Sequence, residues 1–526
     1  MAENRAYSYH TFMFPFMCIN SYKSVYGVFD NDSSENIWYD ADACFDSNSL
    51  RVIKADKRDE NRDYYDSYKF FNEAGRNLIF YDRKTDNVRC YEIKKERSSR
   101  LFYVIGKADS EYRLPIKNIS LKFYSTGIIV FTLCCINEEY RSIDDVKAIN
   151  EYGRRLGLPY WPAVGEKCEK CADYLKIVKI SDRGNDEKDG IYEDILSADF
   201  FTDVSEGKND ISLSYISTVI RQLLNRNGSG YCFRGKPTKN KKQIQMKALL
   251  EEKMYVASLI IDREYSERLY RDYINGGGNF STKEKRSLLE LCRGDTAGKC
   301  SINNNEELDE YIRNHLYLTG FSEESGKLMA VTDQAYIKII PEADYDEEYY
   351  LSAYVPLIVI PVVQRNSIAL FQQRIADTTN STQKKITTST ISEILSLQRE
   401  YVIFQNHYLL ANLTVQKEGR FLYGKLREEL SIAEEKEVLD SQVGRLFELA
   451  NIQQGYSFNK WALYLSLIAL ISSGFAYIVT AKEISEIDFY QFRGWFILIV
   501  TLIVMVLSLL IIQLTVFRKT ENRRKK

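Results

Sequence analysis

The sequence predicts an α+β (mixed α/β) cytoplasmic domain followed by a long helical stalk and two C-terminal transmembrane helices. Three observations predict this class: two uninterrupted apolar runs near the C-terminus, several short β-like runs before residue 140, and apolar residues at three- and four-residue steps between residues 384 and 459. The expected parts are a mixed domain over 1–346, the stalk over 347–459, a first span over 460–481, an outer loop over 482–493, a second span over 494–517 and a basic tail over 518–526.

The two apolar runs, Trp461–Thr480 and Trp495–Phe517, are each long enough to cross a bilayer. A hydrocarbon core about 30 Å thick needs roughly 20 apolar residues in a helix. Neither run contains a charged residue, and a soluble core helix rarely stays apolar on every face over this length. We therefore predict two membrane spans rather than two buried core helices.

The flanking charges predict the orientation. The tail after Phe517 is rich in Lys and Arg, whereas the loop between the runs carries Glu483, Glu486 and Asp488. By the positive-inside rule the tail and the N-terminal body are cytoplasmic and the loop is outside. The N-terminus has no basic region or small-residue cleavage site of the kind that signal peptides carry. We expect a multi-pass membrane protein with both termini in the cytoplasm and a lipid bilayer as its first partner.

The composition argues against several function classes. A net charge of −2 argues against a broad nucleic-acid surface, so no direct nucleic-acid binding is expected. No Ser-His-Asp, HExxH or paired-carboxylate signature is legible, and the chain has only three histidines, which disfavours acid–base catalysis. We expect no enzymatic activity and no cofactor.

One cysteine pair has metal-ligand spacing. Cys168 and Cys171 form a C-x-x-C that would supply half of a tetrahedral zinc site if other cysteines came near. The remaining cysteines show no matching second spacing, and a reducing compartment favours free thiols. We favour plain thiols over zinc.

The body combines strand-like and helix-like segments. A helix is expected from Ser142, with Asp144 and Asp145 in its first turn and Arg154 and Arg155 in its last, the charge order that a helix dipole favours. The glycines around 276–278 indicate a loop. The runs rich in β-branched and aromatic residues are Asn77–Asp82, Val88–Ile93, Leu101–Gly106, Ile119–Ser125 and Gly127–Ile136.

The stalk predicts self-association. Its start is apolar but holds Pro356 and Pro361, so we expect a buried or interfacial helix there rather than a third span. From residue 384 the spacing predicts one long amphipathic helix, or two that break near Gly419 and Gly424. Long helices normally bury their apolar stripe against copies of themselves, which favours a homo-oligomer. Glu483, Glu486 and Asp488 would then repeat around a pore mouth and attract cations, or form only a solvated connector.

This order of parts resembles the CorA family of divalent-cation channels, over about the last 140 residues and as architecture only. The resemblance implies a homo-oligomer, with five copies as the family's number. CorA proteins carry a Gly-Met-Asn motif at the outer end of the first span, and this chain has Gly474, Phe475 and Ala476 there. The missing Asn puts selection of hydrated Mg²⁺ in doubt.

Several segments of the body are similar to CorA-like membrane proteins encoded beside type III CRISPR systems. This resemblance implies an effector of antiviral defence in the bacterial inner membrane. Its soluble domain would sense an adenine-nucleotide messenger, either a cyclic oligoadenylate or an S-adenosylmethionine–AMP conjugate, and its spans would then perturb the membrane. The similar segments are His10–Phe16, Leu121–Cys135, Ile143–Pro159, Leu316–Asp333 and Tyr354–Phe371.

A messenger of this kind needs cations for phosphate, an aromatic face for adenine and amides for its edges. Asn150, Tyr152, Arg154 and Arg155 supply these groups within about one and a half helical turns. The alternative is that the two arginines only complement a helix C-terminus or pair with acidic neighbours. Two further function classes stay open: a constitutive CorA-type Mg²⁺ transporter and a membrane-tethered enzyme.

Overall fold

The computed structural model describes residues 6–18, 25–41, 67–81, 85–93, 101–108, 110–155, 172–180, 187–194, 218–234, 243–250, 253–293, 302, 304–319, 326–343, 345–382 and 387–484. Backbone contacts divide the chain into two compact units. The first, here called the body, comprises Met1–Asn380 and Ser396–Val443. The second, here called the C-terminal unit, comprises Ser381–Leu395 and Gly444–Lys526.

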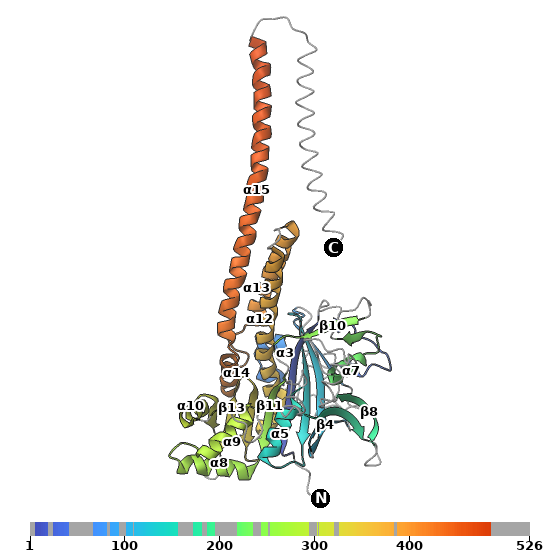
Figure 1. The fold of residues 1–526 in the computed structure, drawn as a ribbon, viewed down its shortest axis with the longest axis vertical. Coiled ribbons are helices and arrows are strands. Elements are labelled where there is room, and N and C mark those ends of the chain that lie inside the picture. Colours follow the sequence, from blue (N-terminus) through green and yellow to red (C-terminus); the bar gives the residue numbers. More distant parts are fainter. Residues whose placement is uncertain are drawn as a thin grey trace, which may run out of the picture. The chain divides into compact units, whose positions relative to one another are not determined.

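A single 14-stranded sheet organises the described part of the body (Figure 1). Its main path runs β12 (Leu316–Thr319), β13 (Lys327–Val331), β14 (Ala335–Ile340), β11 (Tyr255–Ile261), β1 (Ser8–Cys18), β6 (Ile128–Asn137), β5 (Ser110–Tyr124), β4 (Leu101–Lys107), β7 (Tyr174–Ile180) and β8 (Glu187–Asp194). Off this path, β10 (Gln243–Ala248) pairs with β1 and with β9 (Cys232–Arg234), and β3 (Val88–Ile93) pairs with β5 and with β2 (Trp38–Asp40).

Strand β1 is the centre of this sheet. It pairs antiparallel with β6, β11 and β10, while β11 continues in parallel to β14. Side chains alternate between the two faces of a strand, so Phe12, Phe14 and Phe16 point to one face and join a large apolar core. Thr11 points to the opposite face, where its hydroxyl oxygen accepts a hydrogen bond from Tyr350. Both faces of the central strand are therefore covered.

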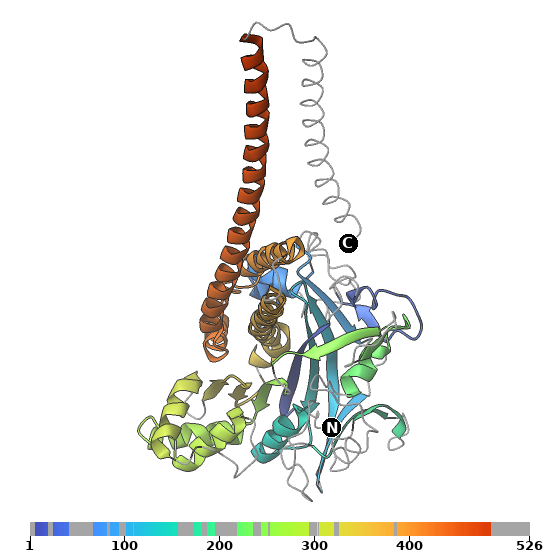
Figure 2. The same ribbon diagram turned by 45° about the horizontal axis from the view of Figure 1, so that its top comes forward.

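In the described part of the body, helices pack against the face of the sheet that Phe12, Phe14 and Phe16 line. Helix α5 (Ile143–Gly153) begins at Ser142, whose side chain accepts a hydrogen bond from the Asp145 amide, which confirms the predicted start. It contacts β1 and β4. Helices α8 (Arg263–Asn275) and α9 (Thr282–Arg293) contact β14, and α10 (Asn305–His315) contacts β12. Figures 1 and 2 show α8, α9 and α10 grouped beside this end of the sheet. Helix α7 (Thr218–Asn225) lies against β7, β8 and β9.

The opposite face of the sheet, where Thr11 lies, is covered by the apolar start of the predicted stalk. A short helix α11 (Tyr345–Tyr349) and a π-helical turn, Tyr350–Tyr354, lead into α12 (Val355–Thr382), which continues through Pro361. Among the described residues, one helical segment, Tyr345–Asn380, is long and apolar enough to cross a membrane, and 83% of its apolar window is buried. This burial agrees with the prediction of a core helix.

Three sequence predictions need correction. The strand predicted over Asn77–Asp82 is wrong at its start: α3 (Glu73–Ile79) includes the first three residues of the run, and the Asn72 side chain caps that helix by accepting from the Gly75 amide. The stalk does not break at Gly419 or Gly424. It forms α13 (Thr388–His407), α14 (Lys417–Glu429) and α15 (Ile432–Ile484), and both glycines lie inside α14. The helix that begins at Ser142 ends at Gly153, so Arg154 is its C-terminal cap and Arg155 lies beyond it, whereas both arginines were expected in its last turn.

In the C-terminal unit, the described part of α15 carries large apolar side chains that are exposed. Between Trp461 and Ile471 they are exposed on every face, at 65% for Leu463, 55% for Leu467 and 73% for Leu470. These residues are the first half of the predicted first span. Glu483 lies in the last turn of α15, while Glu486, Asp488 and the second span lie outside the described residues.

Candidate functional site

The four predicted messenger residues lie together at the C-terminal end of α5, where they meet the centre of the sheet. Asn150 is buried, and its Oδ1 accepts hydrogen bonds from His10 Nδ1 at 2.7 Å and from the Ser258 hydroxyl at 2.9 Å. His10 Nε2 in turn accepts from the Ser8 hydroxyl at 2.9 Å. Burial lowers the pKa of His10 to about 4, although the hydrogen bond with Asn150 opposes that shift. The imidazole is therefore neutral at pH 7.

The Asn150 amide nitrogen is buried and finds no hydrogen-bond partner in the described part of the chain. A buried donor without an acceptor costs roughly 1–3 kcal/mol. Such a group is stabilised by any acceptor that reaches it. The sequence predicted Asn150 as a ligand contact, and the structure places it inside a polar network that joins β1, α5 and β11.

The two arginines have protein partners. Arg154 is 1% exposed and donates from its guanidinium to the Arg293 carbonyl at 2.7 Å and to Gln334 Oε1 at 3.0 Å. Arg155 lies 3.6 Å from Glu151, and both side chains are buried. A phosphate that reached either guanidinium would exchange these contacts for its own. The structure thus gives both arginines partners within the protein, and the Arg155–Glu151 contact is the pairing with an acidic neighbour that the alternative named.

Tyr152 completes the predicted set. It is 9% exposed, and Lys107 Nζ lies 5.2 Å from its ring centroid. The neighbouring Gly153 is required by packing, because a Cβ there would lie 2.8 Å from Phe12 Cζ. The close approach of α5 to β1 therefore holds Tyr152 against the body.

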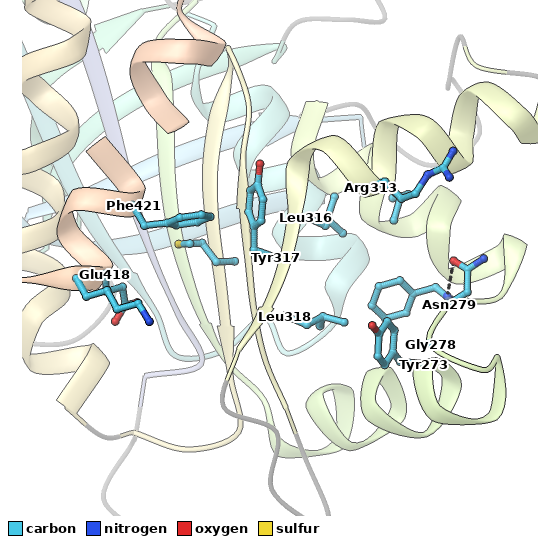
Figure 3. A pocket seen from close by; sticks show the side chains of 13 residues that line it. Tyr273, Gly278, Asn279, Arg313, Leu316, Tyr317, Leu318, Glu418 and Phe421 are labelled. Atoms are coloured by element: carbon cyan, nitrogen blue, oxygen red, sulfur yellow. Dashed lines mark hydrogen bonds between the residues drawn. The ribbon is translucent and has the colours of Figure 1, made fainter. Parts of the chain in front are cut away.

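A separate cavity of about 700 Å³ is lined in part by α14 and is here called the α14 cavity (Figure 3). Tyr317 and Phe421 form one aromatic end, with ring centroids 4.9 Å apart and ring planes at 84°. Tyr273 and Phe280 form another, with centroids 5.4 Å apart. Leu316, Leu318 and Met329 give it an apolar wall.

Charged groups hold the N-terminal end of α14 to the sheet. Lys338 of β14 is almost fully buried; it forms an ion pair with Glu418 and another with Asp346, 2.6 Å away. Lys327 lies 2.8 Å from the second Asp346 oxygen. Burial opposes ionisation of Asp346, but the Lys338 charge and the lysine hydrogen bonds hold its pKa below the ordinary value. Glu418 is thereby tied to a buried cation.

A second ion pair holds the C-terminal end of α14. His315 Nε2 lies 3.2 Å from Glu429, and its Nδ1 donates to the Tyr311 carbonyl at 2.8 Å. Burial opposes protonation, but the hydrogen bond with Glu429 raises the pKa of His315 above its ordinary value. Two residues after Glu429, Ser431 adopts a φ of 49° and α15 begins. The helix α14 is therefore anchored at both ends immediately before α15.

Sequence reasoning missed the α14 cavity, since its lining comes from α8 and the turn after it, the α10–β12 junction, β13 and α14. The glycine run at 276–278, predicted as a loop, is that α8–α9 turn, and Gly277 and Gly278 have φ of 65° and 91°. Within the described ranges no group of three or more His, Cys, Asp or Glu residues is arranged to hold a metal ion. Cys168 and Cys171 lie outside the described residues.

Comparison with known proteins gives little further assignment. No family model matches the chain, and no curated protein matches it. Among solved structures, the CorA magnesium transporter from Methanocaldococcus jannaschii is matched at 14% sequence identity with a TM-score of 0.16, covering 50% of this chain and 91% of that chain. A superposition this loose carries no argument, so the functional conclusion rests on the residues of this chain.

Proposed function

We propose that this protein is a homo-oligomeric membrane effector whose cytoplasmic body senses a small ligand and whose C-terminal helices act on the bilayer. One observation carries the membrane half of the proposal: apolar side chains are exposed on every face of α15 between Trp461 and Ile471. Water-exposed apolar surface of this extent is costly, and lipid or copies of the same helix would remove the cost.

The ligand in this proposal is an adenine-nucleotide second messenger, a cyclic oligoadenylate or an S-adenosylmethionine–AMP conjugate. The resemblance of the body segments to proteins of type III CRISPR antiviral defence supports it, and so does the orphan amide donor of Asn150 beside Arg154 and Arg155. Messenger binding would open an ion-conducting pore or disrupt the membrane of the infected cell.

Gating by a messenger needs a difference in affinity between closed and open forms. Shifting an equilibrium from about 1:99 to 99:1 takes roughly 5.5 kcal/mol, which several ligands bound to one oligomer would supply at about one or two each. A homo-oligomer thus divides the required free energy among its subunits. In this proposal the resting state is closed, because a permanently open pore would kill the host cell.

The test of the whole proposal is ion flux from liposomes that contain the full-length protein. The proposal expects flux with messenger and none without it. Flux without any ligand would favour the constitutive CorA-type divalent-cation transporter instead. Consumption of the messenger without flux would favour a membrane-tethered enzyme.

The messenger contacts are tested by calorimetry on Arg154→Ala and Arg155→Ala. Loss of one charged phosphate contact typically lowers affinity roughly ten- to a hundred-fold. Arg154→Ala also breaks the bond to Gln334, so Gln334→Ala is the matched control: it removes the same internal partner and keeps the cation. Equal affinity losses in Arg154→Ala and Gln334→Ala would mean that Arg154 acts only through packing.

A further inference from the structure

The α14 cavity has the walls of a binding site for a flat ring. Its two aromatic pairs are Tyr317 with Phe421 and Tyr273 with Phe280. They come from β12, from α14, and from α8 with the turn after it; Figure 3 shows Tyr317, Phe421 and Tyr273. Aromatic side chains accept a second ring by stacking or by edge-to-face packing. None of these residues belongs to the predicted messenger set on α5.

The rim of the cavity is positively charged. Lys417 and Arg313 both line it and are both exposed, and neither has an ion-pair partner within the part of the chain that the structure describes. The acidic residue in the lining, Glu418, is held by the buried Lys338. The unpaired charge at the rim is therefore cationic and complements an anion.

The cavity also touches the helix that leads into α15. Lys417, Glu418 and Phe421 lie on the first turns of α14, and Glu418 is the residue that pairs with Lys338 at that end of the helix. Only Leu430 and Ser431 separate α14 from α15. A ligand in contact with Phe421 is thus in contact with the helix that directly precedes α15.

We propose that the α14 cavity binds a small flat aromatic ligand with a negative charge, and that its occupancy shifts α14 and with it the start of α15. The binding half of this inference stands without the proposed function. The coupling half rests on it, because it needs a membrane activity that a ligand controls.

The binding half is tested by calorimetry on the full-length protein in detergent, with adenosine 5′-monophosphate as the probe. Adenosine and inorganic phosphate are the ring-only and anion-only controls, and each should bind at least about ten-fold more weakly than the whole probe. Phe421→Leu removes the ring and Lys417→Gln removes the charge. Each should lower affinity for the probe roughly ten- to a hundred-fold. Arg420→Gln, on the same helix but outside the lining, should change nothing.

The outcomes separate this inference from the proposed function. The inference is overturned if the probe does not bind, or if all variants bind it equally. The proposed function is tested separately, by messenger-dependent flux. A Phe421→Leu protein that loses probe binding and also changes ligand-dependent flux supports both halves. Loss of probe binding with unchanged flux overturns the coupling half. Melting curves of each variant exclude loss of the fold as the cause.

Discussion

His10 shows how one buried imidazole makes stability depend on pH. Its pKa is about 4 in the folded protein against 6.5 when exposed, because burial disfavours the charged form. As pH falls below 6.5 the unfolded chain binds a proton and the folded chain does not. The free energy of unfolding therefore decreases between pH 6.5 and pH 4, by about 3 kcal/mol in all.

This effect predicts the behaviour of His10→Gln. The variant keeps a polar side chain that does not titrate, so its melting temperature should fall less between pH 7 and pH 5 than that of the original protein. Thermal melts at the two pH values measure this difference. Equal falls in both proteins would show that His10 is not the group responsible.

The His315–Glu429 pair makes the free energy of unfolding depend on pH in the opposite direction. Because the pKa of His315 is raised in the folded state, its contribution to stability is complete below the ordinary value of 6.5 and is lost as pH rises through the raised pKa. Glu429→Gln should lower the pKa of His315. The chain has three histidines, so ring-nitrogen NMR titration can follow each of them. An unchanged His315 pKa in Glu429→Gln would contradict the pairing.

Two glycines of α14 allow a matched test of side-chain packing and intrinsic helix propensity. A Cβ on Gly419 would lie 2.6 Å from Phe70 Cζ and 2.7 Å from Thr414 Cγ2, whereas a Cβ on Gly424 would meet nothing within 4 Å. Gly424→Ala should stabilise the protein by about 0.5–1 kcal/mol, because alanine favours the helix. Gly419→Ala should instead destabilise it by about 1–3 kcal/mol through overcrowding. Chemical unfolding of both variants measures this contrast, and a stabilising Gly419→Ala would refute it.

The elements that the sequence predicted well are those with a strong local signal. The alternating β-branched and aromatic runs give β3, β4, β5 and β6, and the Ser142 cap gives the start of α5. The strand prediction for Asn77–Asp82 was wrong because Asn72 caps a helix that begins just before these strand-like residues. The predicted break at Gly419 or Gly424 was wrong because a glycine costs a helix only about 1 kcal/mol, and α14 also buries Leu422, Tyr423 and Leu426.

The candidate sites could be predicted only in part. Asn150, Tyr152, Arg154 and Arg155 were found because they are close in sequence; the structure places the first two in the last turn of α5, Arg154 at its C-terminal cap and Arg155 beyond the helix. The α14 cavity could not be predicted, because Phe280 and Phe421 are brought near only by the fold of the whole body. The partners of Arg154 come from two other segments, so they could not be predicted from the sequence either.

At the scale of the whole molecule, the exposed apolar part of α15 predicts assembly. The detergent-extracted protein should have a mass that is a multiple of 61.2 kDa, and the CorA resemblance implies five copies. Multi-angle light scattering gives that mass. A monomer at micromolar concentration would exclude a pore built from several chains.

The outer loop predicts ion preference. If Glu483, Glu486 and Asp488 ring the pore mouth, replacing all three with amides should lower cation preference in ligand-activated flux and leave messenger affinity unchanged. Flux assays with paired cation and anion reporters measure this preference. An unaltered preference would reduce the loop to a connector.

The central place of β1 has a consequence for synthesis on the ribosome. Strand β1 is made first, yet its partners β6 and β11 end at Asn137 and Ile261, and β14 ends at Ile340. About 120 further residues precede Trp461, which at about 5–20 residues per second takes on the order of 6 to 24 s. The sheet therefore has time to close in the cytosol before the predicted spans are translated. A nascent chain would carry the closed sheet and the predicted messenger residues on α5 before the first predicted span is made, and translation order would keep sensing ahead of membrane damage.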